Sequence, residues 1–376
     1  MKKIAFSCML LWLVMFSNLL MAQDLIWEDI SRGNLNMQCI LVGPENSRII
    51  FAGSSGNILK SDDAGLSWRN VLSLKRNINA VSFNQGNPNI VYAATDNGLY
   101  RSSDLGGRWS RIFRGKNNLE NQCTAVLGTA DTIFTGTKAG LFISTDGGRL
   151  WHKEDGMIGS DAILNIDASK LGDGSIFGKI EPSPFYSIIY LAATSGIFKS
   201  SDSGKTWERI FAADTKRLDE AEAFEDEGTD GPEKVSDIRF IKADINDING
   251  VYFSCAKGVY KSPDQGKTWG KLTEYGLLSR DVKMFCLSGG GKIFALTPSG
   301  FFIFQFERWI EASFGLSGTL NYLALDDKAN IYLAGEKGLF KTEQESPPGF
   351  LRQGLIQEYL KDEPKIRDVQ EAAIKY

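Results

Sequence analysis

The most strongly charged stretch of the chain is residues 214–234, DTKRLDEAEAFEDEGTDGPEK. It holds nine acidic residues against three basic ones. So many charges cannot be buried together, so the stretch predicts a solvated loop, either without a function of its own or serving as an acidic lip that docks a basic or cation-bearing partner. The candidate partner-binding residues are Asp219, Glu220, Glu222, Glu225, Asp226, Glu227 and Asp230.

A calcium site in this stretch would need oxygen ligands at fixed spacings. Four residues stand at positions one, five, six and twelve of a calcium-binding loop: Asp226, Asp230, Gly231 and Asp237. Gly228 and Lys234 occupy positions three and nine, and the terminal bidentate glutamate is missing. The spacing therefore argues against calcium, and we expect neither a metal nor a cofactor.

Residues for acid, base or nucleophilic catalysis are sparse. The only histidine, His152, directly follows Trp151, a position that predicts an exposed strand edge. With one histidine, no multi-histidine metal site can form, and no Ser-His-Asp triad can form away from it. The glycines of SGGGK, Ser288 to Lys292, lie between two predicted strands with no helix following, so they predict a tight turn and not a phosphate loop.

A repeated octapeptide marks where the sequence predicts strands and turns. Its copies are SDDAGLSW from Ser61, SSDLGGRW from Ser102, STDGGRLW from Ser144, SSDSGKTW from Ser200 and SPDQGKTW from Ser262. An apolar run precedes each copy and a short run follows it, which predicts a hairpin turn between strands. The aspartate can accept turn N–H groups, the glycine can take a positive φ, and the tryptophan can pack between sheets.

The structural positions of the octapeptides are therefore the Asp, the Gly and the Trp of each copy. They are Asp63, Gly65 and Trp68; Asp104, Gly106 and Trp109; Asp146, Gly148 and Trp151; Asp202, Gly204 and Trp207; and Asp264, Gly266 and Trp269. The pattern resembles the Asp-box, or BNR, repeat, with Arg108 and Leu150 in place of the hydroxyl residue. This resemblance implies a β-propeller like those of sialidases, sortilin-type receptors, some glucan-cleaving hydrolases and photosystem II assembly factors.

The repeat period gives the number of units. Aligning the glycine that opens each third strand yields seven positions: Gly56, Gly98, Gly140, Gly196, Gly258, Gly300 and Gly338. The base period is near 40 residues, the length of a four-stranded propeller blade. We therefore predict an all-β fold, a seven-bladed β-propeller of four-stranded blades, over residues 24–344. Two units carry insertions, Ser169 to Phe185 on the octapeptide face and Asp214 to Lys234 on the opposite face.

The two ends of the predicted ring are expected to meet. The last unit stops after its third strand, whereas LIWEDI, Leu25 to Ile30, resembles the outer strands that follow the octapeptides. We therefore expect the N-terminal strand to complete the last blade and to pair its open edge. Beyond it, residues 345–376 predict a linker and a short helical C-terminal tail. The tail either lies against the propeller or leads into a further module.

The N-terminus predicts export. Lys2 and Lys3 precede an apolar run that ends near Ala22, which indicates a signal peptide over residues 1–22. An uncleaved leader serving as a membrane anchor is the alternative. Cleavage would change the formal charge from −4 to −6, which does not favour nucleic-acid binding. We predict a periplasmic or secreted protein whose four remaining cysteines, in separate repeats, are mostly free thiols.

The function expected from these features is a non-catalytic protein-binding or assembly scaffold with a protein partner in the envelope. The Arg-Ile-Pro motif of sialidases is absent, and one propeller lacks the cleft that paired propellers form in glucan-cleaving hydrolases. Basic residues in the early inter-blade loops, Lys75, Arg76, Arg111, Arg114 and Lys116, predict an electrically divided face opposite the octapeptides. A carbohydrate-active propeller, lectin or glycoside hydrolase, is the alternative. The oligomeric state is left open.

Overall fold

The computed structural model describes residues 25–31, 33, 35–169, 188–214 and 235–342. All described elements belong to one compact unit that ends at Thr342. The predicted signal peptide, the acidic stretch from 215 to 234, most of the insertion in unit four and the C-terminal tail lie outside the described residues. Within them, no helix is long and apolar enough to cross a membrane.

Units four to seven form four separate four-stranded antiparallel sheets. Their strands are, in order, β12 (Ile163–Ala168), β13 (Ile189–Ala193), β14 (Gly196–Ser200) and β15 (Glu208–Ala212); β16 (Ile238–Ala243), β17 (Val251–Cys255), β18 (Gly258–Ser262) and β19 (Gly270–Lys271); β20 (Met284–Leu287), β21 (Ile293–Thr297), β22 (Gly300–Gln305) and β23 (Arg308–Glu311); and β24 (Leu320–Leu325), β25 (Ile331–Gly335), β26 (Gly338–Thr342) and β1 (Glu28–Asp29).

Units one to three form one larger sheet, because units one and two share β4 and a single parallel bridge, Asn84 to Gly128, links units two and three. Its elements are β2 (Met37–Val42), β3 (Ile50–Ser61), β4 (Arg69–Asn84), β5 (Asn87–Thr95), β6 (Gly98–Ser102), β7 (Ser110–Phe113), β8 (Cys123–Gly128), β9 (Ile133–Thr137), β10 (Gly140–Ser144) and β11 (His152–Lys153), with the one-turn helix α2 (Asn118–Asn121) before β8. The first part of β4 pairs with β3 and its second part with β5, so one strand serves as the outer strand of unit one and the inner strand of unit two.

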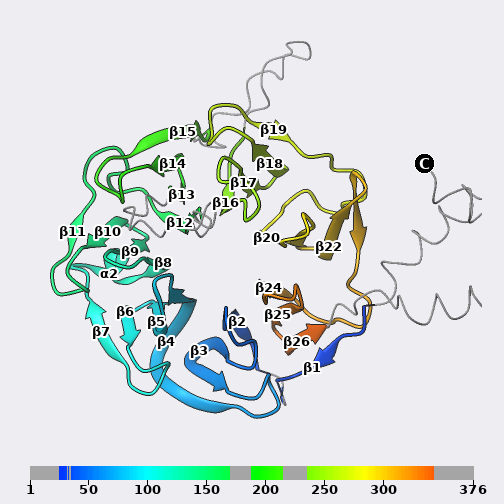
Figure 1. Ribbon diagram of the computed structural model, residues 1–376, viewed down its shortest axis with the longest axis horizontal. Coiled ribbons are helices and arrows are strands. Elements are labelled where there is room, and N and C mark those ends of the chain that lie inside the picture. The colour runs from blue at the N-terminus through cyan, green and yellow to red at the C-terminus, as the bar shows by residue number, and fades with distance from the viewer. Residues whose placement is uncertain (1–24, 32, 34, 170–187, 215–234, 343–376) are drawn as a thin grey trace, which may run out of the picture. The chain divides into compact units, whose positions relative to one another are not determined.

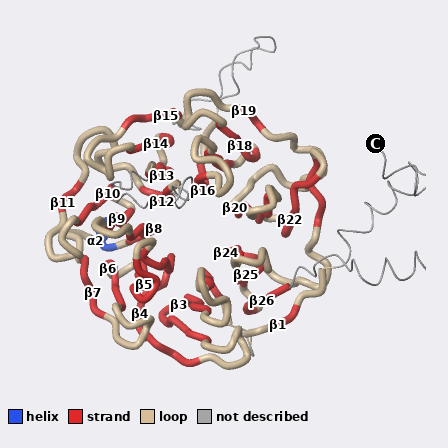
Figure 2. Tube along the Cα trace, viewed as in Figure 1, coloured by secondary structure: helices blue, strands red, loops and turns tan. Residues whose placement is uncertain are grey.

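The sheets are arranged around a common centre, with the first strand of each unit innermost (Figure 1). Each inner strand contacts the inner strand of the next unit, in the order β2, β4, β8, β12, β16, β20 and β24, and β24 contacts β2 again. Strands and loops alternate along the whole ring, as the trace in Figure 2 shows. The fold is a β-propeller, and the pairing is consistent with seven blades.

The N-terminal strand closes the ring as expected. Glu28 and Asp29 of β1 pair with Lys341 and Phe340 of β26, and Ile30 N donates to Leu339 O at 2.9 Å. The strand is shorter than the Leu25 to Ile30 predicted from the sequence. Closure pairs the edge of the last blade that would otherwise be open.

The core lies between the blades. The second strands of units four to seven are buried along their whole length because each is covered by a sheet on both sides. Six inner strands carry a bulge directly after the first residue that pairs with the second strand of the same unit, which bends the strand at that point. The four described cysteines, Cys39, Cys123, Cys255 and Cys286, are free thiols, as expected.

Tryptophan side chains join successive blades by a recurring hydrogen bond. The indole N–H of each tryptophan donates to a backbone carbonyl of the preceding unit. The acceptor residue lies three or four positions after the tryptophan of that preceding unit. The pairs are Trp68 to Ile30 (2.6 Å), Trp151 to Ile112 (2.8 Å), Trp269 to Ile210 (3.2 Å), Trp309 to Thr273 (2.8 Å) and Trp27 to Ala312 (3.2 Å). A large apolar ring with one donor suits this position, because the ring fills the junction and the donor fixes its orientation.

Two junctions lack this bond. The indole nitrogens of Trp109 and Trp207 are buried and find no hydrogen-bond partner among the described residues. The residue that packs against the octapeptide glycine also differs between junctions. Phe51 packs against Gly106 and Phe134 packs against Gly204. In the other three octapeptides, an isoleucine that follows the tryptophan of the preceding unit packs against the glycine. The blades are therefore joined in two different ways.

Candidate functional site

The antiparallel order of the strands gives the propeller two faces. The octapeptide face carries the octapeptides and the connections from inner to second strands. The loop face carries the described connections from each outer strand to the next inner strand, which are residues 35–36, 114–122, 154–162, 272–283 and 313–319, together with the middle of β4 at residues 74–77 and the turns between second and third strands. The two faces differ in their polar contacts.

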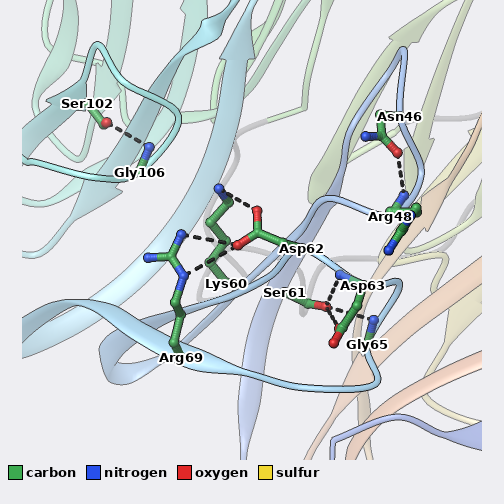
Figure 3. A network of polar contacts seen from close by, with 10 residues as sticks. All are labelled: Asn46, Arg48, Lys60, Ser61, Asp62, Asp63, Gly65, Arg69, Ser102 and Gly106. Carbon is green, nitrogen blue, oxygen red and sulfur yellow. Dashed lines mark hydrogen bonds and ion pairs between the residues drawn. The ribbon is translucent and has the colours of Figure 1, made fainter.

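Each octapeptide is a turn whose polar groups bond to one another. In the first, Ser61 Oγ donates to Asp63 Oδ1 at 2.8 Å and accepts from Gly65 N at 2.8 Å (Figure 3). The same two contacts recur in the other four copies at 2.7 to 2.9 Å. The aspartate also accepts the backbone N–H of the seventh residue in every copy.

The hydroxyl of the seventh residue adds a further bond where it is present. Thr268 Oγ1 donates to Asp264 Oδ2 at 2.7 Å, and Ser67 Oγ to Asp63 Oδ2 at 2.6 Å. The hydroxyl and backbone N–H of Ser67 lower the pKa of Asp63 to about 2, and the N–H and hydroxyl of Thr268 lower the pKa of Asp264 to about 2. These carboxylates are held as hydrogen-bond acceptors, which does not suit them to transfer protons near neutral pH.

The turn needs two consecutive residues with positive φ. The octapeptide glycines have φ between +84° and +95°, as expected from their type. The residue before each glycine is also left-handed, and in four copies it is not glycine: Ala64, Leu105, Ser203 and Gln265. Sequence reasoning missed this position, because nothing in its variable side chains marks the strained backbone.

One segment and one residue that were considered for catalysis have structural roles. Ser288 to Lys292 form a tight turn between β20 and β21, in which Gly291 N donates to Ser288 O at 3.0 Å. His152 is exposed in β11 and pairs with Ile143. Both predictions are confirmed, and neither group offers a site.

The centre of the ring holds a polar cluster that the sequence did not reveal. The Lys242 Nζ atom lies 3.0 Å from Asp167 Oδ1, while Asp167 Oδ2 accepts from Ala243 N at 2.9 Å. Asn165 Oδ1 accepts from Ile241 N at 3.1 Å. Two side chains of β12 thus bond to the backbone of β16, which ties the inner strands of two blades together.

Neither Lys242 of this cluster nor the nearby Cys286 is reactive at neutral pH. Burial raises the pKa of Cys286 to about 11, and its thiol donates to Leu323 O at 3.4 Å. Burial acts to lower the pKa of Lys242, but the charge of Asp167, the nearby Cys286 and the hydrogen bond to Asp167 together outweigh burial and raise the pKa. A protonated thiol and a charged ammonium are poor nucleophiles at neutral pH, so the cluster is a structural one.

The loop face carries an apolar sector over three successive connections. Phe314 is 88% exposed, Tyr275 and Leu278 are each 70% exposed, and Leu35 is 45% exposed. Two of these connections are bonded to a strand of a neighbouring blade: Trp309 N of β23 donates to Tyr275 O at 2.8 Å, and Asn321 Nδ2 of β24 donates to Asn36 Oδ1 at 3.1 Å. We call Leu35, Tyr275, Leu278 and Phe314 the apolar sector.

The carboxylates beside Tyr275 are already paired. Glu274 forms ion pairs with Lys271 and Arg280, and Asp281 lies 3.1 Å from Arg239 Nε. A glycosidase needs one carboxyl group to give a proton and another to act as base or nucleophile. Carboxylates compensated by nearby cations fit that task poorly, so Tyr275 does not mark an acid and base pair.

The same face carries a basic sector over blades one to three. It consists of exposed residues in the middle of β4, in β7 and in the connection and turn that follow: Lys75, Arg76, Arg111, Arg114, Lys116 and Lys138. The sequence predicted five of them on this face. Lys138 lies next to them because Lys138 N donates to Gln122 O at 3.1 Å, and Gln122 ends the connection that carries Arg114 and Lys116. Within the described part of the chain, none of the six takes part in an ion pair.

The predicted acidic lip cannot be placed against these sectors. Its seven candidate residues, from Asp219 to Asp230, lie outside the described residues, as do the candidate calcium positions Asp226 and Asp230. Among the residues that are described, no group of three or more histidine, cysteine or acidic side chains could hold a metal ion.

Neither a family model nor a curated protein sequence matches the chain. Solved structures do. The extracellular domain of B. thetaiotaomicron BT4673, described as belonging to a one-component system, is 15% identical with a TM-score of 0.61, covering 85% of this chain and 40% of that one. The chain thus spans about two fifths of that structure.

Two further structures resemble the chain equally well. YCF48 bound to a D1 peptide is 13% identical with a TM-score of 0.59, covering 84% of this chain and 96% of that one. An ancestral GH74 enzyme is 14% identical with a TM-score of 0.63, covering 85% and 46%. At such low identity the likeness shows the fold and no more, and that fold is the β-propeller.

Proposed function

We propose that the protein is a non-catalytic β-propeller that binds another protein through its loop face. The observation that carries this proposal is the apolar sector, in which two aromatic and two leucine side chains are left in water on adjoining connections. Exposed apolar side chains gathered in one region indicate an interaction surface, and aromatic residues supply much of the binding energy at such surfaces.

The surrounding geometry supports binding without catalysis. The octapeptide aspartates are engaged in their turns, and the carboxylates next to Tyr275 are paired with cations. The fold is also compatible with this function, since YCF48, a propeller of similar shape, was solved with a bound peptide. Export to the periplasm or beyond, with a partner in the envelope, remains part of the proposal.

A carbohydrate-active propeller is the second candidate. Exposed rings such as Tyr275 and Phe314 can stack on sugars as well as pack on protein, and one similar structure is a GH74 enzyme. The ion pairs of Glu274 and Asp281 argue against hydrolysis but leave a lectin function to be tested.

The test places a photo-crosslinking amino acid at Phe314 or Leu278 and, as a matched control, at the exposed Leu66 or Leu150 of the octapeptide face. After irradiation in an extract of the source cells, we expect a discrete protein adduct from the loop-face positions alone. Equal adducts from both faces, or retention of glycan without protein, would overturn the proposal. The same extract, applied to a variant lacking residues 215–234, tests whether the acidic stretch contributes to binding.

A further inference from the structure

We propose that the basic sector of the loop face binds an acidic, extended segment of the protein partner. This inference rests on the proposed function and states the chemistry of one part of the partner. The sector consists of Lys75, Arg76, Arg111, Arg114, Lys116 and Lys138, all exposed.

Hydrogen bonds hold these residues in one region. Asp96 N donates to Asn77 O at 3.2 Å, which joins the middle of β4, where Lys75 and Arg76 lie, to the turn between β5 and β6. Arg111 Nη1 donates to Asn97 Oδ1 of that turn at 3.2 Å. The connection after β7, with Arg114 and Lys116, is joined in turn to Lys138. The cations are therefore fixed on contiguous backbone.

The carboxylates in this region are used by neutral donors. Asp96 accepts from Asn77 Nδ2 at 3.1 Å and from Asn79 Nδ2 at 2.9 Å. Glu120 is buried, and its Oε2 accepts from Lys116 N at 2.6 Å. Neither forms an ion pair with a cation of the sector. Because neutral donors do not cancel the charge of a carboxylate, these two negative charges lie with the six positive ones, which leaves an excess of positive charge in this described region.

Such a concentration of one charge sign on a protein with an overall acidic composition produces a local positive potential. It attracts a partner of opposite charge and fixes its orientation more than it adds affinity. The exposed Leu119 of α2 follows Lys116 in the same connection, and the apolar sector lies on the same face. Apolar contacts beside the cations favour a polypeptide over a polysaccharide as the anionic ligand.

The test uses fluorescein-labelled peptides and the whole mature chain. The probe is a 15-residue peptide of alternating glutamate and serine, and its counterpart carries lysine in place of each glutamate. By fluorescence anisotropy at low salt, we expect the acidic peptide to bind and the basic one not to bind. The Arg76→Glu and Arg114→Glu double variant should weaken binding about tenfold, since it reverses two charges at the rim of the site.

The matched control reverses two exposed cations of the octapeptide face, Lys205→Glu and Lys267→Glu, which gives the same net charge. This variant should bind the acidic peptide as the wild type does. Equal weakening by both variants, or binding that ignores the sign of the peptide, would overturn the inference. So would binding of dextran sulfate without binding of the acidic peptide.

The two proposals fail separately. If crosslinking at Phe314 captures a protein while the peptides show no preference, the proposed function stands and this inference is wrong. If the acidic peptide binds through the basic sector but no protein adduct forms at Phe314 or Leu278, the apolar sector does not have the function proposed for it.

Discussion

The octapeptide face and the loop face of this propeller are made from the same repeats but in opposite ways. On the octapeptide face, five turns share one hydrogen-bond pattern, and serine, aspartate and glycine satisfy one another within each turn. On the loop face, the connections differ in length and sequence, although both faces leave some apolar and cationic side chains in water. One face repeats, whereas the other varies.

This difference separates stability from recognition. A turn whose polar groups are already paired has little capacity left for a ligand, but its loss would leave buried donors without acceptors. A loop with exposed side chains contributes little to folding and is free to bind. Substitutions within the octapeptide turns should therefore reduce the stability of the fold, and substitutions of exposed side chains on the loop face should reduce binding with little effect on stability.

The largest contrast is expected for two glycines of similar backbone conformation. Gly266 (φ +91°) lies against Ile210, whereas Gly315 (φ +85°) has nothing within 4 Å of an added Cβ. Gly266→Ala should cost about 3 kcal/mol from strain and overpacking together, and Gly315→Ala about 1 kcal/mol from strain. Urea unfolding measures both, and equal losses would contradict the assignment of Gly266 to a packed junction.

Removal of an octapeptide hydroxyl should have the next largest effect. Ser262 is fully buried and accepts from Gly266 N at 2.7 Å. Ser262→Ala leaves that N–H unpaired and should cost about 2 kcal/mol. The matched Ser317→Ala on the loop face removes an exposed hydroxyl and should leave the urea midpoint unchanged. A stable Ser262→Ala variant would show that the turn does not depend on this bond.

A smaller difference should separate the two kinds of blade junction. Trp269→Phe loses a bond from the indole N–H to Ile210 O, whereas Trp207→Phe removes a donor that has no partner among the described residues. Both variants lose ring volume, so we expect Trp269→Phe to be more destabilising by about 1 kcal/mol. The free energies of unfolding by urea decide this, and a larger loss at Trp207 would contradict it.

The smallest effect concerns acid stability. The folded pKa of Asp264 is about 2, below its ordinary value of 3.8, so the unfolded state binds more protons between these values. Its contribution to stability is present above pH 4 and is lost as the pH falls toward 2. The Tm difference between the wild type and Asp264→Asn should shrink over that interval. A constant difference across it would contradict the depressed pKa.

Much of the fold could be predicted because the octapeptide fixes both local geometry and packing. A glycine with positive φ, an aspartate that accepts turn N–H groups and a tryptophan at each junction are properties of residue type and recur in every copy. The closure by β1 was predictable in the same way, since Trp27 begins a segment similar to the other outer strands. In the structure, only Glu28 and Asp29 pair with β26, and Ile30 N adds one backbone hydrogen bond to Leu339 O.

The two kinds of junction were not predicted, although a signal exists. The third residue after the tryptophan is isoleucine in the strands that precede bonded octapeptide junctions, Ile30, Ile112 and Ile210, but Val71 or Glu154 before Trp109 and Trp207. The contacts of Asp167 with Lys242 and Ala243 also escaped prediction, because they join blades across long sequence distances. The left-handed turn at Phe306 and Glu307, in a unit that has no octapeptide, was also not predicted.

The pairing of β1 with β26 has a consequence for the time course of folding. The last blade holds the first described strand and the last ones, so its sheet cannot be completed until the chain has been made as far as Thr342. Earlier blades can form while synthesis continues, but the final edge stays open until then. Contacts between distant segments close slowly, so we expect ring closure to be a late step in folding, which an N-terminal truncation through Ile30 would abolish.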